Sequence, residues 1–306
     1  MKKLFTLLVL IISFSMNAQM SDNSSGDANA TGTNAVAMGN ATTASGNYST
    51  AMGRNTTASG TVSTAMGGTT TASGDYSTAM GYSTTASGYR STAMGQSTTA
   101  SGTRSTAMGH STTASGARST AMGRNTTASD YASTVIGQYN SSGSSVTNNA
   151  TSFNTANTAF VIGNGTNSSN KSDAFKVMFN GDTTVSNDLT VSGDVVISSD
   201  ARLKSNIVSL GSTLAKLLQI DGKSYEMKGK QKIGVLAQEI KEVFPELVSK
   251  DDNEMLAVNY QGLVPVLINA LKEQDAKMKE QQSEIETYRD EVSELKEMVQ
   301  SLVSKE

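Results

Sequence analysis

The stretch Ser91-Thr92-Ala93-Met94-Gly95-Gln96-Ser97-Thr98-Thr99-Ala100-Ser101-Gly102-Thr103-Arg104 is one unit of a repeat that fills more than a third of the chain. Its methionine recurs every 14 residues from Met38 to Met122, and Ile136 takes the eighth place. Repetition at a fixed period is typical of a solenoid, in which one coil cannot bury its own core and stacked neighbours do. The sequence therefore predicts eight stacked coils over residues 30–140.

Fourteen residues are also two heptads, so a coiled coil is the first alternative. Two glycines in each unit would cost a helix about 2 kcal/mol relative to alanine, and the charged e and g positions are missing. Collagen needs glycine at every third place. The pattern instead favours a β-solenoid in which Ser-Thr-Ala-Met and Thr-Thr-Ala-Ser form short strands and the glycines turn the chain. We expect Met and Ala to point into each coil.

The motif Ser-Thr-Ala-Met-Gly resembles the S-V-A-I-G motif in the head of YadA-like trimeric adhesins. The resemblance covers residues 30–140. It implies a left-handed parallel β-roll that assembles as a homotrimer.

Residues 141–198 are rich in Asn, Ser, Thr and Gly and contain short alternating runs at 159–163, 174–179 and 189–197. Alternation and turn signals such as Asn180-Gly181-Asp182 favour extended strands. A single chain would bury little here. We therefore expect a β-rich stem in which three chains are intertwined.

The composition changes abruptly at Ser199-Asp200-Ala201-Arg202-Leu203-Lys204-Ser205-Asn206-Ile207. A serine hydroxyl becomes a good nucleophile only when a base takes its proton, and a lysine is such a base only when burial keeps it neutral near pH 7. Ser-Lys pairs are a known variant of the catalytic triad. By spacing alone, however, the pair is equally a turn serine and a solvated lysine.

The whole string resembles the start of the intramolecular chaperone domain of phage endosialidases and tail fibres, which opens with S-D-x-R-x-K-x-x-I. Two further stretches, 233–240 and 243–248, match the same family. The resemblance covers residues 199–306 and implies a trimeric chaperone that folds the fibre upstream and then cuts itself off. It makes Ser199 the nucleophile and Lys204 the general base, places the cleaved bond between Ser198 and Ser199, and gives Asp200 and Arg202 supporting roles.

The C-terminal region should combine helices at 210–218 and 237–244 with strands at 224–227 and 232–235. A long helix, 263–303, follows and carries a sustained heptad, which predicts a coiled coil of about 60 Å. The resemblance to trimeric families implies that three chains form it. Glutamines at two d positions add polar layers. The apolar a and d positions that we assign to the trimer seam are Val264, Leu267, Leu271, Met278, Ile285, Val292, Leu295, Val299 and Leu302.

The N-terminus, Met1-Lys2-Lys3 followed by an apolar run and Asn17-Ala18, predicts a signal peptide over 1–18, with a polar segment over 19–29. We therefore expect a secreted protein, held at the cell surface or outer membrane, with no membrane-spanning segment in the mature chain. The net charge of −3 and the absence of a basic domain argue against nucleic acid as a partner. With one histidine, His110, and no cysteine, no metal site and no cofactor is predicted.

Arg90, Arg104 and Arg118 share one repeat position and should stack as a ladder along the roll. The ladder is either a solvated face or a surface for an acidic glycan, extracellular matrix or another cell-surface ligand. Adjacent threonines such as Thr42 and Thr43 should point to opposite faces, which disfavours a flat ice-binding face.

Taken together, these patterns predict a mainly β protein with a C-terminal α+β domain: a homotrimeric fibre or adhesin whose chaperone domain cleaves itself. The alternative is a purely structural, ice-binding or glycan-binding solenoid with an uncleaved trimerisation domain.

Overall fold

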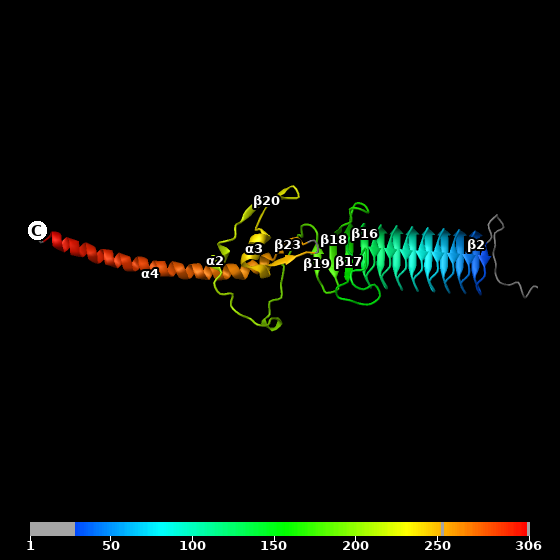
Figure 1. The fold of residues 1–306 in the computed structure, drawn as a ribbon, viewed down its shortest axis with the longest axis horizontal. Coiled ribbons are helices and arrows are strands. Elements are labelled where there is room, and N and C mark those ends of the chain that lie inside the picture. The colour runs from blue at the N-terminus through cyan, green and yellow to red at the C-terminus, as the bar shows by residue number, and fades with distance from the viewer. Residues whose placement is uncertain (1–27, 252–253, 305–306) are drawn as a thin grey trace, which may run out of the picture. The chain divides into compact units, whose positions relative to one another are not determined.

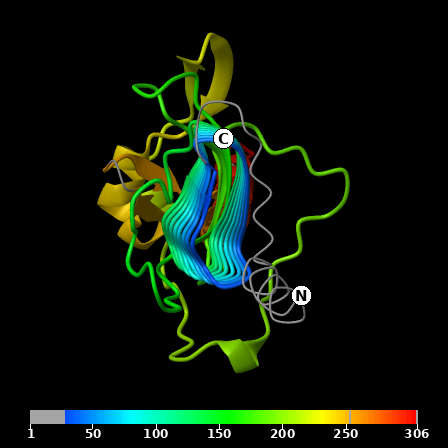
Figure 2. The same ribbon diagram turned by 90° about the vertical axis from the view of Figure 1, so that its right-hand side faces the viewer.

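The computed structural model describes residues 28–251 and 254–304, so the predicted signal peptide at 1–18 and all but the last two residues of the polar segment at 19–29 lie outside the described residues. The chain divides between Val195 and Val196 into two compact units. The first unit is the stack of coils in Figure 1, where strands β2 to β16 follow one another along the roll. Seen along the stack, successive coils superpose (Figure 2).

Two parallel sheets form the roll. The shorter strands make an eight-stranded sheet: β1 (Asn29–Ala30), β3 (Thr43–Ala44), β5 (Thr57–Ala58), β7 (Thr71–Ala72), β9 (Thr85–Ala86), β11 (Thr99–Ala100), β13 (Thr113–Ala114) and β15 (Thr127–Ala128). The longer strands start an eleven-stranded sheet: β2 (Val36–Asn40), β4 (Thr50–Arg54), β6 (Thr64–Gly68), β8 (Thr78–Tyr82), β10 (Thr92–Gln96), β12 (Thr106–His110), β14 (Thr120–Arg124) and β16 (Thr134–Gln138). Each residue pairs with its equivalent 14 positions away, as Met94 does with Met108. The predicted parallel β-roll is confirmed.

Small residues fill most of the space between the two sheets, and valines join them only at its end, at Val135 and Val161. Ala93 and Ala100 are fully buried, as are Ser91 and Thr98. Met94 is only half-buried, because a strand sends successive side chains to opposite faces and its neighbour Ala93 points inward. The expectation that Met and Ala both point inward was therefore wrong: the methionines form a row on the outer face of the longer strands.

The repeated glycines are required by the close stacking of the coils. Gly95 has φ +117°, and a Cβ atom built on it would lie 2.1 Å from the carbonyl oxygen of Gly109 in the next coil. No side chain fits at that distance, and few residues other than glycine adopt that backbone conformation. Glycine at this place therefore fixes the spacing of the coils.

The end of the roll is closed by two buried polar side chains. Asn140 pairs with the backbone of Thr127 through both its amide oxygen and its amide nitrogen, at 2.8 Å each, where the next strand of the shorter sheet would bind. Asp130, which replaces a repeat glycine, accepts hydrogen bonds from the backbone amides of Thr147 (2.6 Å) and Thr158 (2.8 Å). These two side chains end one sheet and fasten the loop that follows.

The longer sheet continues beyond Asn140. Strand β17 (Thr158–Asn164) pairs in parallel with β16 and places Val161 in the alanine row of the core. Antiparallel strands β18 (Asp173–Met178) and β19 (Thr183–Val185) complete the sheet. Residues 189–197, expected as a strand, form none in the single chain, and Leu189 and Val196 are exposed to 70% and 88%.

The second unit begins with a single turn of 3-10 helix, η1 (Ala201–Leu203), and a short helix, α2 (Leu214–Leu217), which is shorter than the helix predicted over 210–218. The hairpin of β20 (Lys223–Met227) and β21 (Lys230–Gly234) follows, then α3 (Ala237–Val243), η2 (Pro245–Leu247) and the hairpin of β22 (Val248–Lys250) and β23 (Leu256–Val258). Last come η3 (Tyr260–Gly262) and the helix α4 (Leu263–Val303).

A small apolar core holds the second unit together around Ile240, Phe244 and Val266. Glu273 of α4 adds a polar link, because its carboxylate accepts hydrogen bonds from the backbone amide of Thr213 and the hydroxyl of Ser212 at the start of α2. These bonds hold the pKa of Glu273 below its usual value. No described helix is long and apolar enough to cross a membrane.

Candidate self-cleavage site

The predicted nucleophile and base lie together at the start of the second unit. The Nζ atom of Lys204 donates a hydrogen bond to Oγ of Ser199 at 2.8 Å. Residues five positions apart in an extended chain lie up to about 17 Å apart. The turn η1 brings the chain back on itself between the two residues and so allows this contact.

Asp200 organises that turn. Its carboxylate accepts a hydrogen bond from the backbone amide of Arg202 at 2.8 Å, which caps the first turn of η1. The guanidinium of Arg202 also reaches back to the same carboxylate at 2.7 Å. The hydrogen bonds from Arg202 hold the pKa of Asp200 below its usual range, and the same contact raises the pKa of Arg202. The two supporting residues of the motif therefore shape the loop and do not touch the Ser199 hydroxyl.

The site is open to solvent in the single chain. Residues 191–212 are all exposed, including Ser198, Ser199 and Lys204. Three apolar side chains beside the site, Leu203, Ile207 and Val208, are exposed to 72%, 67% and 82%. Burying exposed apolar side chains is favourable, so these three gain free energy when they are covered. The loop thus has the composition of a surface that another chain covers.

The residues assigned to the trimer seam lie along one side of α4 and are exposed. Their exposed fractions run from 46% for Leu267 to 69% for Leu271. Val266 and Ala270 of the same helix are buried against the rest of the unit. One face of the helix is therefore used within the chain, and the heptad face has no partner among the described residues.

Sequence analysis overlooked three positions that shape the fold. Asp130 and Asn140 close the roll, and Glu273 fixes the start of α2. Two of them left a sequence signal: Asp130 stands where the repeat has glycine, and Asn140, 14 residues after Thr126, stands where the repeat has threonine. The hydrogen-bond partners of all three residues are distant from them in the sequence, so no local pattern predicts these contacts.

Comparison with known families identifies both regions. Two-copy models of the YadA head domain repeat match residues 30–56, 58–84, 86–112 and 114–140. The model of the chaperone of endosialidase, a peptidase family, matches residues 199–249. A comparison with curated proteins finds no match. The chain thus carries YadA head repeats followed by a chaperone of endosialidase domain, and this architecture supports a trimeric adhesin or tail fibre.

Proposed function

We propose that the protein is a homotrimeric adhesin or fibre, secreted or held at the cell surface, whose chaperone domain assembles the trimer and then cuts the chain between Ser198 and Ser199. The observation that carries the proposal is the 2.8 Å contact between Lys204 Nζ and Ser199 Oγ. It falls at the first residue matched by the chaperone family.

The reaction needs only groups of this chain and water. Ser199 Oγ attacks the carbonyl carbon of Ser198 while a neutral Lys204 takes the hydroxyl proton. Lys204 then returns the proton to the departing Ser199 nitrogen, which leaves Ser198 joined to Ser199 Oγ as an ester. Water hydrolyses the ester to a Ser198 carboxylate and a free Ser199 amino terminus.

The exposure of Lys204 supports a link between cleavage and assembly. A lysine loses its proton near neutral pH only when it is removed from water. In one chain the loop has no cover, so cover must come from neighbouring protomers. Cleavage would then wait until the trimer has formed, and the chaperone would leave only a finished fibre.

Two apolar surfaces support the trimer. One is the exposed heptad seam of α4. The other is the row of half-buried methionines on the longer sheet, continued by Ile136 and Ile162 through the register of β16 and β17. The row runs across nine strands, β17 included. Eight spacings of about 4.8 Å make it about 38 Å long. Both surfaces would be buried by association.

The test is a denaturing gel of the wild type beside Ser199→Ala and Lys204→Ala, with Ser205→Ala as the matched control. We expect the wild type and the control to yield a fragment of residues 199–306 without added protease, and both site variants to stay full-length. Mass spectrometry of the fragment should find Ser199 at its amino terminus. Equal processing of Ser199→Ala would refute the proposed nucleophile.

The dependence on assembly has its own test. Chain unfolded in urea should remain intact and begin to cleave after the urea is diluted. Cleavage at the same rate in urea would show that the pair needs no assembled site.

A further inference from the structure

One edge of the roll carries three arginines in successive coils. The turn at this edge has the sequence Gly-x-x-Ser, and its second variable residue is an arginine in three coils: Arg90, Arg104 and Arg118. Each of them has a positive φ near 60°. Neighbouring parallel strands lie about 4.8 Å apart, so the backbones at these positions repeat at that distance. The ladder predicted from the sequence is therefore present as a row of exposed positive charges.

The middle arginine has no partner. Arg90 lies over the rings of Tyr76 and Tyr89, at 5.5 and 4.9 Å from their centroids, and Arg118 lies over the ring of Tyr131 at 5.3 Å. Within residues 28–251 and 254–304, Arg104 has neither an ion pair nor an aromatic ring beside its guanidinium. Three stacked like charges without a carboxylate attract an anion.

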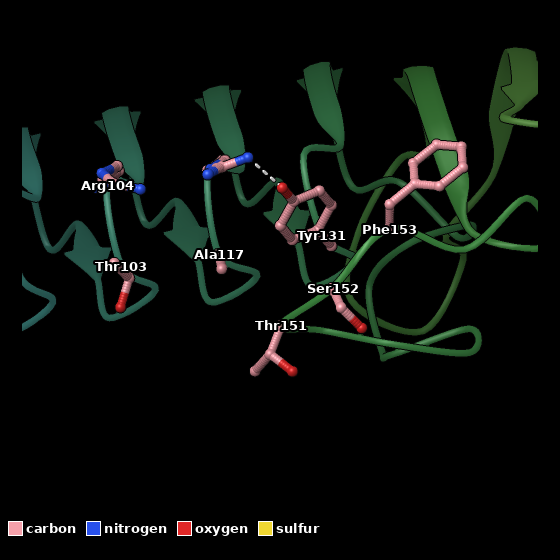
Figure 3. Close-up of a pocket in the computed structure, with 8 residues that line it drawn as sticks. Thr103, Arg104, Ala117, Tyr131, Thr151, Ser152 and Phe153 are labelled. Atoms are coloured by element: carbon pink, nitrogen blue, oxygen red, sulfur yellow. Dashed lines mark hydrogen bonds between the residues drawn. The ribbon is translucent and has the colours of Figure 1, made fainter.

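A groove of about 340 Å³ lies along this edge at Arg104 and Arg118. Its far wall is the loop that follows the roll, held there by backbone hydrogen bonds from Ala117 to Ala150 (2.7 Å) and from Tyr131 to Asn149 (3.0 Å). Figure 3 shows Phe153 on that loop, beyond Tyr131 and along the same edge as Arg104. Phe153 is 61% exposed. The groove thus combines two guanidinium groups with one exposed aromatic ring, that of Phe153, which also contacts the Phe179 ring in a T-shaped arrangement at 5.2 Å between centroids.

The repeat itself shows where a carboxylate binds on this edge. Asp75 is the first variable residue of its Gly-x-x-Ser turn. Its side chain accepts a hydrogen bond, at 2.8 Å, from the backbone amide of Thr61 one coil earlier. Asn47 does the same for Thr33 at 3.1 Å. For Thr103 the equivalent position is Ala117, which has no side-chain oxygen. The amide of Thr103 consequently has no acceptor in the described part of the chain, and it lies in the groove beside Arg104.

We propose that this groove binds a glycan chain with carboxylate groups, of the uronic acid class, with one carboxylate at the Thr103 amide between Arg104 and Arg118. Charges repeated at each coil suit a polymer with charged sugars at regular intervals, and the exposed Phe153 ring can stack on a sugar ring. An acidic peptide would share the charge but not the sugar rings, and the experiment below separates the two. The site is independent of the Ser199–Lys204 pair.

The test uses the full-length protein and titrates it with an oligogalacturonate. Two matched probes separate the chemistry: the fully methyl-esterified oligomer keeps the sugars without the charge, and oligoglutamate of equal length keeps the charge without the sugars. We expect the oligogalacturonate to bind and the two matched probes not to bind. Added salt should weaken the binding because the contacts are ionic.

Two substitutions locate the site. Arg104→Ala should weaken binding at least tenfold, whereas Arg54→Ala removes the same charge from the other edge of the roll and should leave binding within about twofold. Ala117→Asp places a carboxylate where Asp75 has one in its own coil, so the protein itself would occupy the Thr103 amide. This substitution should abolish glycan binding and leave the melting temperature of the head unchanged. The retained fold separates loss of the site from loss of structure.

Four outcomes would overturn the proposal. Equal binding of oligoglutamate would make the edge a general surface for acidic polymers, including acidic peptides. Equal binding of the esterified oligomer would exclude a role for the arginines. Unchanged affinity in Ala117→Asp would place the glycan elsewhere. Absence of binding to the charged oligomer would also reject the site.

Discussion

The roll and the C-terminal helix α4 bury their apolar side chains in opposite ways. In the roll, each coil buries its alanines completely against the next coil, so one chain supplies its own core. Along α4 the corresponding apolar residues stay about half exposed or more, and only a second chain can cover them. A short-period repeat makes its core from neighbours in sequence, whereas a heptad seam requires neighbours in space. The instability of an isolated protomer is therefore concentrated at the C-terminus.

The largest effect is expected when the seam is charged. Ile285→Asp with Val292→Asp would place three like charges in each of two buried layers of a trimer, at a cost of several kcal/mol per layer. We expect light scattering to report monomers and the gel to show no cleavage. Thr287→Asp with Ser293→Asp adds the same charge to positions outside the seam and should leave both properties unchanged. A stable monomer of the uncut wild-type chain would contradict the seam assignment directly.

A smaller effect is expected in the roll, and it should be local. Gly109→Ala places a Cβ 2.1 Å from the carbonyl oxygen of Gly123 at a φ of +122°. Strain and overpacking together should destabilise the head by about 3 kcal/mol or more. Thermal unfolding followed by circular dichroism measures the loss.

The control for this change is Gly68→Ala, whose Cβ would meet only the edge of the Tyr82 ring at 3.1 Å and whose φ is not positive. It should cost far less. If both variants unfold alike, close stacking of the coils is not what requires the repeat glycine.

The smallest effect should be a gain in stability. The Thr98 hydroxyl is fully buried and has no hydrogen-bond partner, as is true of its equivalents in the other described coils. An unsatisfied buried hydroxyl is costly, so the isosteric change Thr98→Val should stabilise the head by about 1 kcal/mol. This would raise its melting temperature by about 2–4 °C. Thr99→Val, at the next residue, where the side chain faces outward at the start of β11, should change little. A loss of stability in Thr98→Val would show that the hydroxyl is satisfied in the assembled protein.

Much of the architecture followed from the sequence because its signals are local and repeated. The 14-residue period predicted the stacked coils, and the sustained heptad predicted a helix over 263–303, the range of α4. The strings around Ser199 and Ile233 predicted the chaperone domain. The adjacent threonines Thr42 and Thr43 do face opposite sides, as the alternation of a strand requires.

Tertiary structure decided what these local signals leave open. The direction of the methionines depends on the narrow gap between the two sheets, which holds Ala, Ser and Thr in the repeats and valine only at its end, at Val135 and Val161. The alternating pattern over 189–197 likewise does not decide whether a strand forms, since the segment is exposed and unpaired in the single chain. The caps at Asp130 and Asn140, the brace at Glu273 and the groove at Arg104 all join residues that lie apart in the chain. A periodic sequence determines its own coil, but the ends, edges and partners of the coil are set by contacts that only the folded chain creates.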